Sequence, residues 1–214
     1  VGAAMSENCD WSIATEGLGE HYNITVMTTK NHGCCGHTFA AIDAALAIQQ
    51  EHGLTDADIK TIRVGGYTPT IDICSGTDHR TPYEGKFSVP YLVATALTHG
   101  SVRMDAFSDA RLTDPATTAL AKKVSLYLDE SVDAAFPKKR SARITVETND
   151  GRTLEHFQPT RKGDPELPLS DDEISGKFRE LVTPITGEPI AASLLEACWS
   201  LEDLKSLRDL PFGT

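Results

Sequence analysis

The chain has 214 residues, of which 40% are hydrophobic and 24% charged, a composition typical of a folded globular protein. Its formal net charge of -11 argues against nucleic-acid binding, which usually depends on a basic face. The same charge means that an anionic ligand must be held by local positive groups against a repulsive overall field.

The sequence contains five cysteines, an odd number, and two of them, Cys34 and Cys35, are adjacent. Disulfide frameworks of secreted proteins usually have an even number at higher density, so we expect a reducing compartment, the cytoplasm. We find no apolar run close to the roughly 20 residues that span a bilayer and no signal-peptide pattern, so we expect no membrane partner. Because the chain begins at Val1 rather than at an initiator Met, we expect a fragment or a processed chain.

The first half of the chain alternates between strand patterns and helix patterns. Tyr22, Ile24 and Val26 alternate with polar residues, which is typical of a strand. Gly53 and Gly100 stand where two apolar helical patterns stop, as expected of residues that end helices. We therefore predict, in order, a strand within 20–29, a helix over 38–52, a strand over 59–68, a long polar loop over 72–86 and a buried helix over 88–99.

The second half predicts a β-hairpin followed by a helical tail. Asn149-Asp150-Gly151 between two strand patterns is a strong hairpin signal, and Asp114-Pro115 and Ser170-Asp-Asp-Glu173 are residue types that begin helices. We predict a helix from Asp114, strands over 124–128, 141–148 and 152–157, a linker over 161–168, and helices over 170–181, 188–199 and 201–207. This order favours an α+β fold: a small antiparallel or mixed sheet with helices packed on it, followed by a C-terminal helical tail. The tail has an apolar face of its own, which we expect to pack on something other than the sheet.

The segment Lys30–Thr38 combines one Lys, two His and two Cys with glycines, directly before an apolar helix. A helix N-terminus offers free N–H groups and the positive end of the helix dipole. Such a place suits an anion, and we expect a carboxylate ligand there. Lys30 fits either a solvated strand end or an ammonium that binds a carboxylate or transfers a proton. Arg80, with His79, and Lys86 are likewise either solvated loop residues or further positive charge at this site.

The cysteines and histidines of this segment allow three further interpretations. His32, Cys34, Cys35 and His37 are zinc-ligand types, but adjacent cysteines rarely bind one tetrahedral ion together, and no second ligand pair follows. A Cys at a helix N-terminus beside His and Lys can be a nucleophile with a depressed pKa, although the sequence assigns it no triad partner. Alternatively, both cysteines pack as small hydrophobes at the helix entry. The residues alone leave these alternatives open, and we predict no metal site.

Five motifs, taken together, resemble a known family. The first is Lys30-x4-Cys35-x-His37-Thr38-x2-Ala41-Ile42-Asp43-Ala44-Ala45. The others are Glu84-Gly85-Lys86-Phe87-Ser88-Val89-Pro90-Tyr91, Phe107-Ser108-Asp109 through Asp114-Pro115, Phe136-Pro137 through Ala142-Arg143-Ile144-Thr145-Val146, and Lys162-Gly163-Asp164-Pro165 through Pro168-Leu169-Ser170. In this order they resemble the MmgE/PrpD family, which includes 2-methylcitrate dehydratase, cis-aconitate decarboxylase and iminodisuccinate epimerase.

The resemblance implies a cofactor-independent enzyme that acts on a small di- or tricarboxylate as a dehydratase, decarboxylase or epimerase. Members have a large helical domain and a smaller α+β lid domain, with the active site in the crevice between them, and they usually form homodimers. The chain matches the lid and the C-terminal helices that return to the helical domain. Residues 1–20 would then end a preceding helical region, 21–160 form the lid, and 161–214 pack on the helical domain, which is missing from this sequence.

The resemblance also implies roles for individual residues. Lys30 matches the lid lysine that points into the crevice, and Cys35 falls where decarboxylase-type members have a catalytic histidine. That departure weighs against decarboxylation unless His37 substitutes from two positions on. Lys86 and Ser88 match a motif beside the crevice. We therefore predict Lys30, Cys35 and His37 as catalytic residues and Arg80, Lys86 and Ser88 as substrate-binding residues.

The expected chemistry is proton transfer at a carbon alpha to a carboxylate. Cationic groups would hold the carboxylates and stabilise the developing enolate charge, and a lid would exclude water. Because the acid/base partner would come from the missing helical region, we expect the chain alone to be inactive or nearly so. The alternative is a non-catalytic stand-alone module or the partner subunit of a split enzyme. The apolar face of the tail also predicts self-association.

Overall fold

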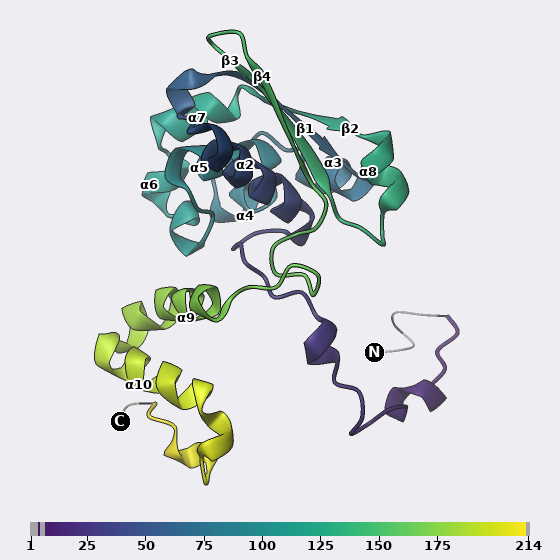
Figure 1. Cartoon of the computed structure of the whole chain (residues 1–214), viewed down its shortest axis with the longest axis vertical. Helices are drawn as coiled ribbons and strands as arrows, with labels where there is room; N and C mark the ends of the chain where they lie inside the picture. Colours follow the sequence, from purple (N-terminus) through teal and green to yellow (C-terminus); the bar gives the residue numbers. More distant parts are fainter. Residues whose placement is uncertain (1–3, 5–6, 213–214) are drawn as a thin grey trace.

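The computed structural model describes residue 4 and residues 7–212, and within them lies a four-stranded sheet (Figure 1). The strands are β1 (Ile59–Gly66), β2 (Val124–Leu128), β3 (Ala142–Thr148) and β4 (Thr153–Gln158), in the spatial order β2-β1-β3-β4. Strand β2 runs parallel to β1, whereas β3 pairs antiparallel with both β1 and β4. The predicted α+β fold with a mixed sheet is therefore confirmed.

The β3–β4 hairpin turns where the Asn149-Asp150-Gly151 signal predicts. Gly151 has a φ of +89°, in the left-handed region that favours glycine, and its N–H donates to the carbonyl of Thr148 at 3.1 Å. Along β3, fully buried residues alternate with less buried ones. This period of two is expected of a sheet that is covered on one face.

Two long helices, α2 (Phe39–His52) and α5 (Val89–His99), pack against each other and cover the sheet (Figure 1). Their apolar side chains form one core with Ile62, Val64, Ile144 and Val146 of the sheet, all of which are fully buried. Both helices end as predicted, at Gly53 and Gly100 with φ of +61° and +73°.

Five shorter helices complete this part of the fold, namely α3 (Thr68–Cys74), α4 (Pro82–Gly85), α6 (Asp109–Leu112), α7 (Pro115–Ala121) and α8 (Glu130–Ala135). Helix α7 begins at Asp114, as predicted, with the Asp114 carboxylate accepting from the N–H of Thr117 at 2.9 Å. The segment predicted as a loop over 72–86 instead holds the end of α3 and all of α4. Helix α4 is a single turn, so apolar periodicity cannot reveal it, but its Thr81–Glu84 capping box is a local signal.

The strand predicted within residues 20–29 is wrong. This segment contains a short 3-10 helix, Asn23–Val26, and no described strand pairs with it. Tyr22, Ile24 and Val26 are 63%, 76% and 67% exposed. A strand needs a neighbouring edge to pair its backbone N–H and C=O groups, and alternation of side chains does not supply one.

The predicted helical tail consists of α9 (Asp171–Thr186) and α10 (Glu188–Trp199), which pack on each other away from the sheet (Figure 1). Helix α9 begins at the predicted capping box of Ser170 and Glu173, and it ends at Thr186 rather than near 181. The indole N–H of Trp199 donates to Ser175 Oγ at 3.0 Å and joins the two helices. Two single 3-10 turns, Leu201–Asp203 and Leu207–Asp209, replace the helix predicted over 201–207.

The chain enters and leaves the sheet-and-helix body (residues 32–160) at one crossing point. The N–H of Thr29 donates to the carbonyl of Gly163 at 2.8 Å. Gly163 has a φ of +98°, and a Cβ there would lie 2.0 Å from the carbonyl oxygen of Thr29, so only glycine fits. Beside this contact, Asp164 accepts from Thr28 Oγ1 and from Arg161 Nη2, both at 2.6 Å. The entry segment (residues 7–31) is thereby fastened to the linker that leads into α9.

Among the described residues, no helix is both long and apolar enough to cross a membrane. Residues 1–3 and 5–6 of the predicted helical end, and residues 213–214 of the tail, lie outside the described residues.

Candidate functional site

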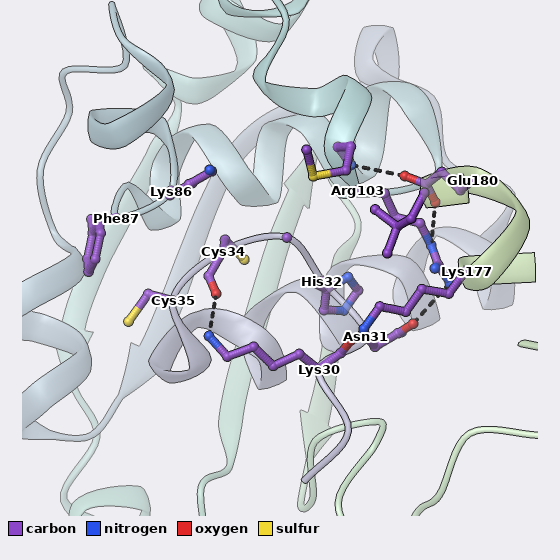
Figure 2. Close-up of a pocket in the computed structure, with 13 residues that line it drawn as sticks. Lys30, Asn31, His32, Cys34, Cys35, Lys86, Phe87, Arg103, Lys177 and Glu180 are labelled. Atoms are coloured by element: carbon purple, nitrogen blue, oxygen red, sulfur yellow. Dashed lines mark hydrogen bonds and ion pairs between the residues drawn. The ribbon is translucent and has the colours of Figure 1, made fainter. Parts of the chain in front are cut away.

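A pocket of about 440 Å³ opens between the body and helix α9 (Figure 2). Its walls come from stretches that are far apart in the sequence: residues 30–35, 86–87 and 103–104, and one face of α9. The lining residues are Lys30, Asn31, His32, Gly33, Cys34, Cys35, Lys86, Phe87, Arg103, Met104, Lys177, Glu180 and Leu181. The pocket thus lies beside the loop before α2 rather than at the N-terminal N–H groups of the helix.

Backbone hydrogen bonds hold the loop that carries Lys30. The N–H of Gly33 donates to the carbonyl of Val102 at 3.2 Å, and the N–H of Cys35 donates to the carbonyl of Lys86 at 3.1 Å. Both bonds tie the loop to other walls of the pocket. The positions of these walls are therefore coupled through the backbone.

A buried carboxylate anchors the same loop to helix α2. His32 is 4% exposed, and its Nε2 lies 2.8 Å from Asp43 Oδ1. The other oxygen of Asp43 accepts from the N–H of Lys162 at 2.8 Å. Asp43 is satisfied on both oxygens, so it fastens the pocket loop and the linker to one helix.

The ammonium group of Lys30 lies at the pocket beneath the loop (Figure 2). Its Nζ donates to the carbonyl of Cys34 at 3.3 Å and lies 5.9 Å from the centroid of the Phe39 ring. An ammonium has three N–H donors, and this carbonyl is the acceptor of one. Lys30 therefore keeps donors for a ligand in the pocket.

The cysteines of the loop differ in environment. Cys34 is buried, its Sγ lies 3.2 Å from Thr38 Oγ1, and burial raises the pKa of its thiol to about 12. Burial also raises the pKa of Cys74, whose thiol contacts Cys35. Cys34 and Cys74 are thus core thiols that stay protonated, whereas Cys35 is half-buried and lines the pocket.

His37 is not part of the pocket lining and lies in an aromatic cluster with Tyr67 and Phe136. Its Nδ1 is 2.9 Å from the hydroxyl of Tyr67, whose ring stacks on Phe136 with centroids 4.6 Å apart. Burial, together with the positive charges of Arg140 and Arg161, lowers the pKa of His37. The imidazole is therefore biased towards its neutral form.

The three residues predicted to bind substrate lie in different environments. Lys86 lines the pocket, with its Nζ 5.3 Å from the centroid of the Phe107 ring. Ser88 is buried, and its hydroxyl accepts from the N–H of Tyr91 at 3.2 Å, which makes it the residue that begins α5. Arg80 is exposed, 3.4 Å from Asp78, and is not part of the pocket lining.

The far side of the pocket consists of residues that the sequence analysis missed. Arg103 Nε lies 3.5 Å from Glu180 of α9, and the N–H of Met104 donates to Glu180 at 3.0 Å. Lys177, also of α9, donates to the carbonyl of Lys30. No local pattern marks these residues, because the docking of α9 brings them to the pocket.

The charged side chains that line the pocket carry a net positive charge, in a protein whose net charge is -11. Four cationic side chains line it, Lys30, Lys86, Arg103 and Lys177, against one carboxylate, Glu180. Such a local excess of positive charge attracts anions despite the overall field. The described residues contain no group of three or more His, Cys, Asp or Glu side chains placed to hold a metal ion.

Comparison with curated proteins finds relatives among enzymes. The chain is 27% identical over 205 residues to cis-aconitate decarboxylase-like protein oryM of Aspergillus oryzae, covering 92% of this chain and 42% of the relative. It is 26% identical to cis-aconitate decarboxylase of Aspergillus terreus, over 91% of this chain and 41% of the relative. It is 25% identical to cis-aconitate decarboxylase of Mus musculus, over 76% and 34%. The chain thus spans about two fifths of the length of its fungal relatives.

Comparison with protein families agrees with the motifs. Residues 32–202 match the MmgE/PrpD C-terminal domain. The match includes the sheet, the helices that cover it, and the α9–α10 tail. The chain therefore belongs to the MmgE/PrpD family.

Proposed function

We propose that the chain is the C-terminal, lid part of a cofactor-independent MmgE/PrpD-type lyase or isomerase that acts on a small di- or tricarboxylate. The observation that carries the proposal is the pocket beside Lys30, in which four cationic side chains face one carboxylate. The names of the relatives make cis-aconitate the first substrate to test. The reaction step would be proton transfer at a carbon alpha to a carboxylate.

The residues that line the pocket would have different roles in this reaction. Lys30 and Lys86 would bind carboxylates of the substrate, the reacting one included, and stabilise the enolate charge that develops as the proton leaves. Cys35 also lines the pocket and would face the substrate. For His37, Arg80 and Ser88, which do not line the pocket, a catalytic or binding role rests on the resemblance alone.

The exposed apolar side chains of the entry segment and the tail support the proposal that a helical domain completes the enzyme. Large hydrophobic side chains are exposed along the entry segment and the tail. A helical domain would cover them and supply the acid/base partner, and the assembled enzyme would be a homodimer of the cytoplasm. The chain alone would then bind a substrate without turning it over.

Calorimetric titration of the chain with cis-aconitate tests the substrate class. We expect saturable binding that weakens about tenfold in Lys30→Gln and in Lys86→Gln, because each removes a charge-assisted hydrogen bond. Lys60→Gln is the matched control, because Lys60 is 63% exposed, pairs with Glu147 on the sheet and is not part of the pocket lining. Binding that is absent, or equally weak in all three variants, would overturn the proposal.

An activity assay on the same samples separates the proposed lid from the alternative classes. We expect no turnover of cis-aconitate by the chain alone, and turnover after coexpression with the N-terminal region of a full-length relative. Turnover by the chain alone would refute the need for a second half. An intact mass of 23.1 kDa in the source cell, together with no binding to any helical partner, would favour the non-catalytic module.

A further inference from the structure

The side of the pocket opposite the Lys30 ammonium already holds a carboxylate, that of Glu180 (Figure 2). One oxygen of Glu180 accepts from the N–H of Met104 at 3.0 Å, and the other lies 3.5 Å from Arg103 Nε. A backbone N–H thus donates to one oxygen of the carboxylate, and the guanidinium of the preceding residue forms an ion pair with the other. This is the donor arrangement by which proteins recognise carboxylate ligands.

Arg103 has more donors than Glu180 uses. Its Nη2 donates to Asn31 Oδ1 at 3.1 Å. Its Nη1 is buried and has no hydrogen-bond partner among the described residues. Buried donors are rarely left without a partner, so the guanidinium has a free position that an additional oxygen would satisfy.

Lys177 adds a second cation to this side. Its Nζ donates to the carbonyl of Lys30. Burial, with the nearby charge of Arg103, lowers the pKa of Lys177. The cations of Arg103 and Lys177 thus lie near each other with only one carboxylate of the pocket lining, that of Glu180, between them. A further anion would stabilise both positive charges.

We propose that Arg103, the Met104 N–H and Lys177 form a second carboxylate-binding site of the pocket, and that Glu180 occupies it when no ligand is bound. This inference rests on the proposed function, since it concerns the distal carboxylate of the same ligand. A tricarboxylate would place two carboxylates near Lys30 and Lys86, as a dicarboxylate would, and its third carboxylate on Arg103. In the absence of ligand, the carboxylate of Glu180 would take the place of this ligand carboxylate.

The exchange is physically favourable because a carboxylate replaces a carboxylate. Arg103 keeps an anionic partner throughout, so neither state leaves its charge buried and unpaired. The Glu180 side chain is 30% exposed at the pocket rim, so it can turn into solvent when displaced. The site would therefore favour ligands whose extra carboxylate outcompetes Glu180, and it would select tricarboxylates over dicarboxylates.

Two ligands of the same carbon skeleton test this selection. Tricarballylate and glutarate share a three-carbon chain with terminal carboxylates, and only tricarballylate has a third, central one. We expect Glu180→Gln to increase the affinity for tricarballylate by about tenfold and that for glutarate by less than about twofold. We expect Arg103→Gln to lower the tricarballylate affinity to near that of glutarate, and Lys177→Gln to have the same effect in weaker form.

Asp105→Asn is the matched control for charge. It removes one negative charge two residues from Arg103, but Asp105 is exposed, pairs with Arg111 at 2.7 Å and is not part of the pocket lining. Circular dichroism of each variant checks folding. Glu180→Gln is a conservative change at a partly exposed residue, and it keeps the test valid if an Arg103 variant unfolds.

The outcomes separate this inference from the proposed function. If Glu180→Gln and Asp105→Asn change both affinities equally, Glu180 only docks α9 on the body, and the inference is overturned while Lys30-dependent binding still stands. If the unchanged chain binds neither ligand, the proposed function fails and the inference fails with it. A selective gain for tricarballylate in Glu180→Gln alone supports the second site.

Discussion

The body and the flanking segments of this chain bury their apolar residues to very different extents. In the body, large side chains such as Ile42, Leu92 and Ile144 are completely inaccessible to solvent. Among the described residues, twenty large hydrophobic side chains are exposed, of which seven precede residue 32 and eight follow residue 160. A monomeric protein rarely leaves such apolar surface uncovered. The body thus contains its own stabilising core, whereas the flanks expose apolar side chains of the kind that interfaces usually cover.

The pocket lies on the boundary between these two regions. Lys86 and Arg103 belong to the body, Lys30 to the entry segment, and Lys177 and Glu180 to the tail. Binding at this pocket therefore depends on how the flanks are held against the body. Four measurements can break or sharpen the contrast.

The largest effect is expected in the core of the body. Leu92→Ala in α5, at a residue with no exposed surface, should lower the free energy of unfolding by about 2–5 kcal/mol through lost burial and a residual cavity. Urea unfolding followed by circular dichroism measures it. Ile185→Ala in the tail, where the side chain is 83% exposed, is the control and should change stability by less than about 0.5 kcal/mol. Equal losses would contradict the contrast between the regions.

Self-association tests whether the tail is an interface. Ile185→Asp should weaken association of the isolated chain by about 1–2 kcal/mol, because burying an apolar side chain in a contact contributes about that much. Light scattering across a concentration series measures the shift. If the unchanged chain is monomeric at every concentration, the tail does not self-associate. Its apolar face would then be covered by a different protein or stay exposed.

Local signals predicted much of the fold, and the failures show why the rest was out of reach. The capping residues Asp114 and Ser170 and the stop at Gly53 act within one helical turn, so the residues that interact are close together in the sequence and their pattern can be recognised there. The segment at 20–29 failed because a strand depends on a partner elsewhere, which no local pattern reports.

The pocket shows the same limit. Lys30, Cys35 and Lys86, which the motifs predict as site residues, line the pocket, and their roles stay predictions. Arg103 and Glu180 could not be predicted, because they are 77 positions apart in the sequence. Their side chains come within 3.5 Å of each other only because α9 packs against the body. Ser88 was chosen from a motif, but its position in that motif reflects the start of α5.

Acid should loosen the crossing point between entry segment and linker. Burial disfavours the charged form of Asp164, but hydrogen bonds from Arg161 and Thr28 outweigh it and hold the pKa of Asp164 below its usual value. Its contribution to stability is therefore complete above the ordinary carboxyl pKa of about 3.9 and is lost as the pH falls further, through the lower folded value.

Asp164→Asn removes this contribution, so the stability difference from the unchanged chain should shrink as the pH falls from about 5 to 2. Urea unfolding at several pH values measures the difference, with Asp72→Asn, at an exposed residue, as control. A difference that stays constant over this range would show that the Asp164 charge does not stabilise the crossing.

The smallest effect is expected at Arg80. Its ion pair with Asp78 is exposed, with side chains 79% and 70% accessible, and such pairs contribute about 0–1 kcal/mol. Arg80→Gln should leave the unfolding midpoint unchanged within error. Because stability is unaffected, any change in ligand affinity in this variant would report directly on a binding role, and a large loss would mean that the loop reaches the pocket when ligand is bound.

The contact of Thr29 with Gly163 gives the body the geometry of an inserted domain, because the chain enters and leaves it at one place. Thr29 and Gly163, which flank the body on either side, are joined by a hydrogen bond of 2.8 Å, as expected of a domain inserted into a loop of another. If the proposed helical domain surrounds the body, that scaffold is continuous in space although its chain is interrupted by more than a hundred residues. Removing the body and rejoining residues 29 and 163 through a short glycine bridge would leave the path of that scaffold undisturbed.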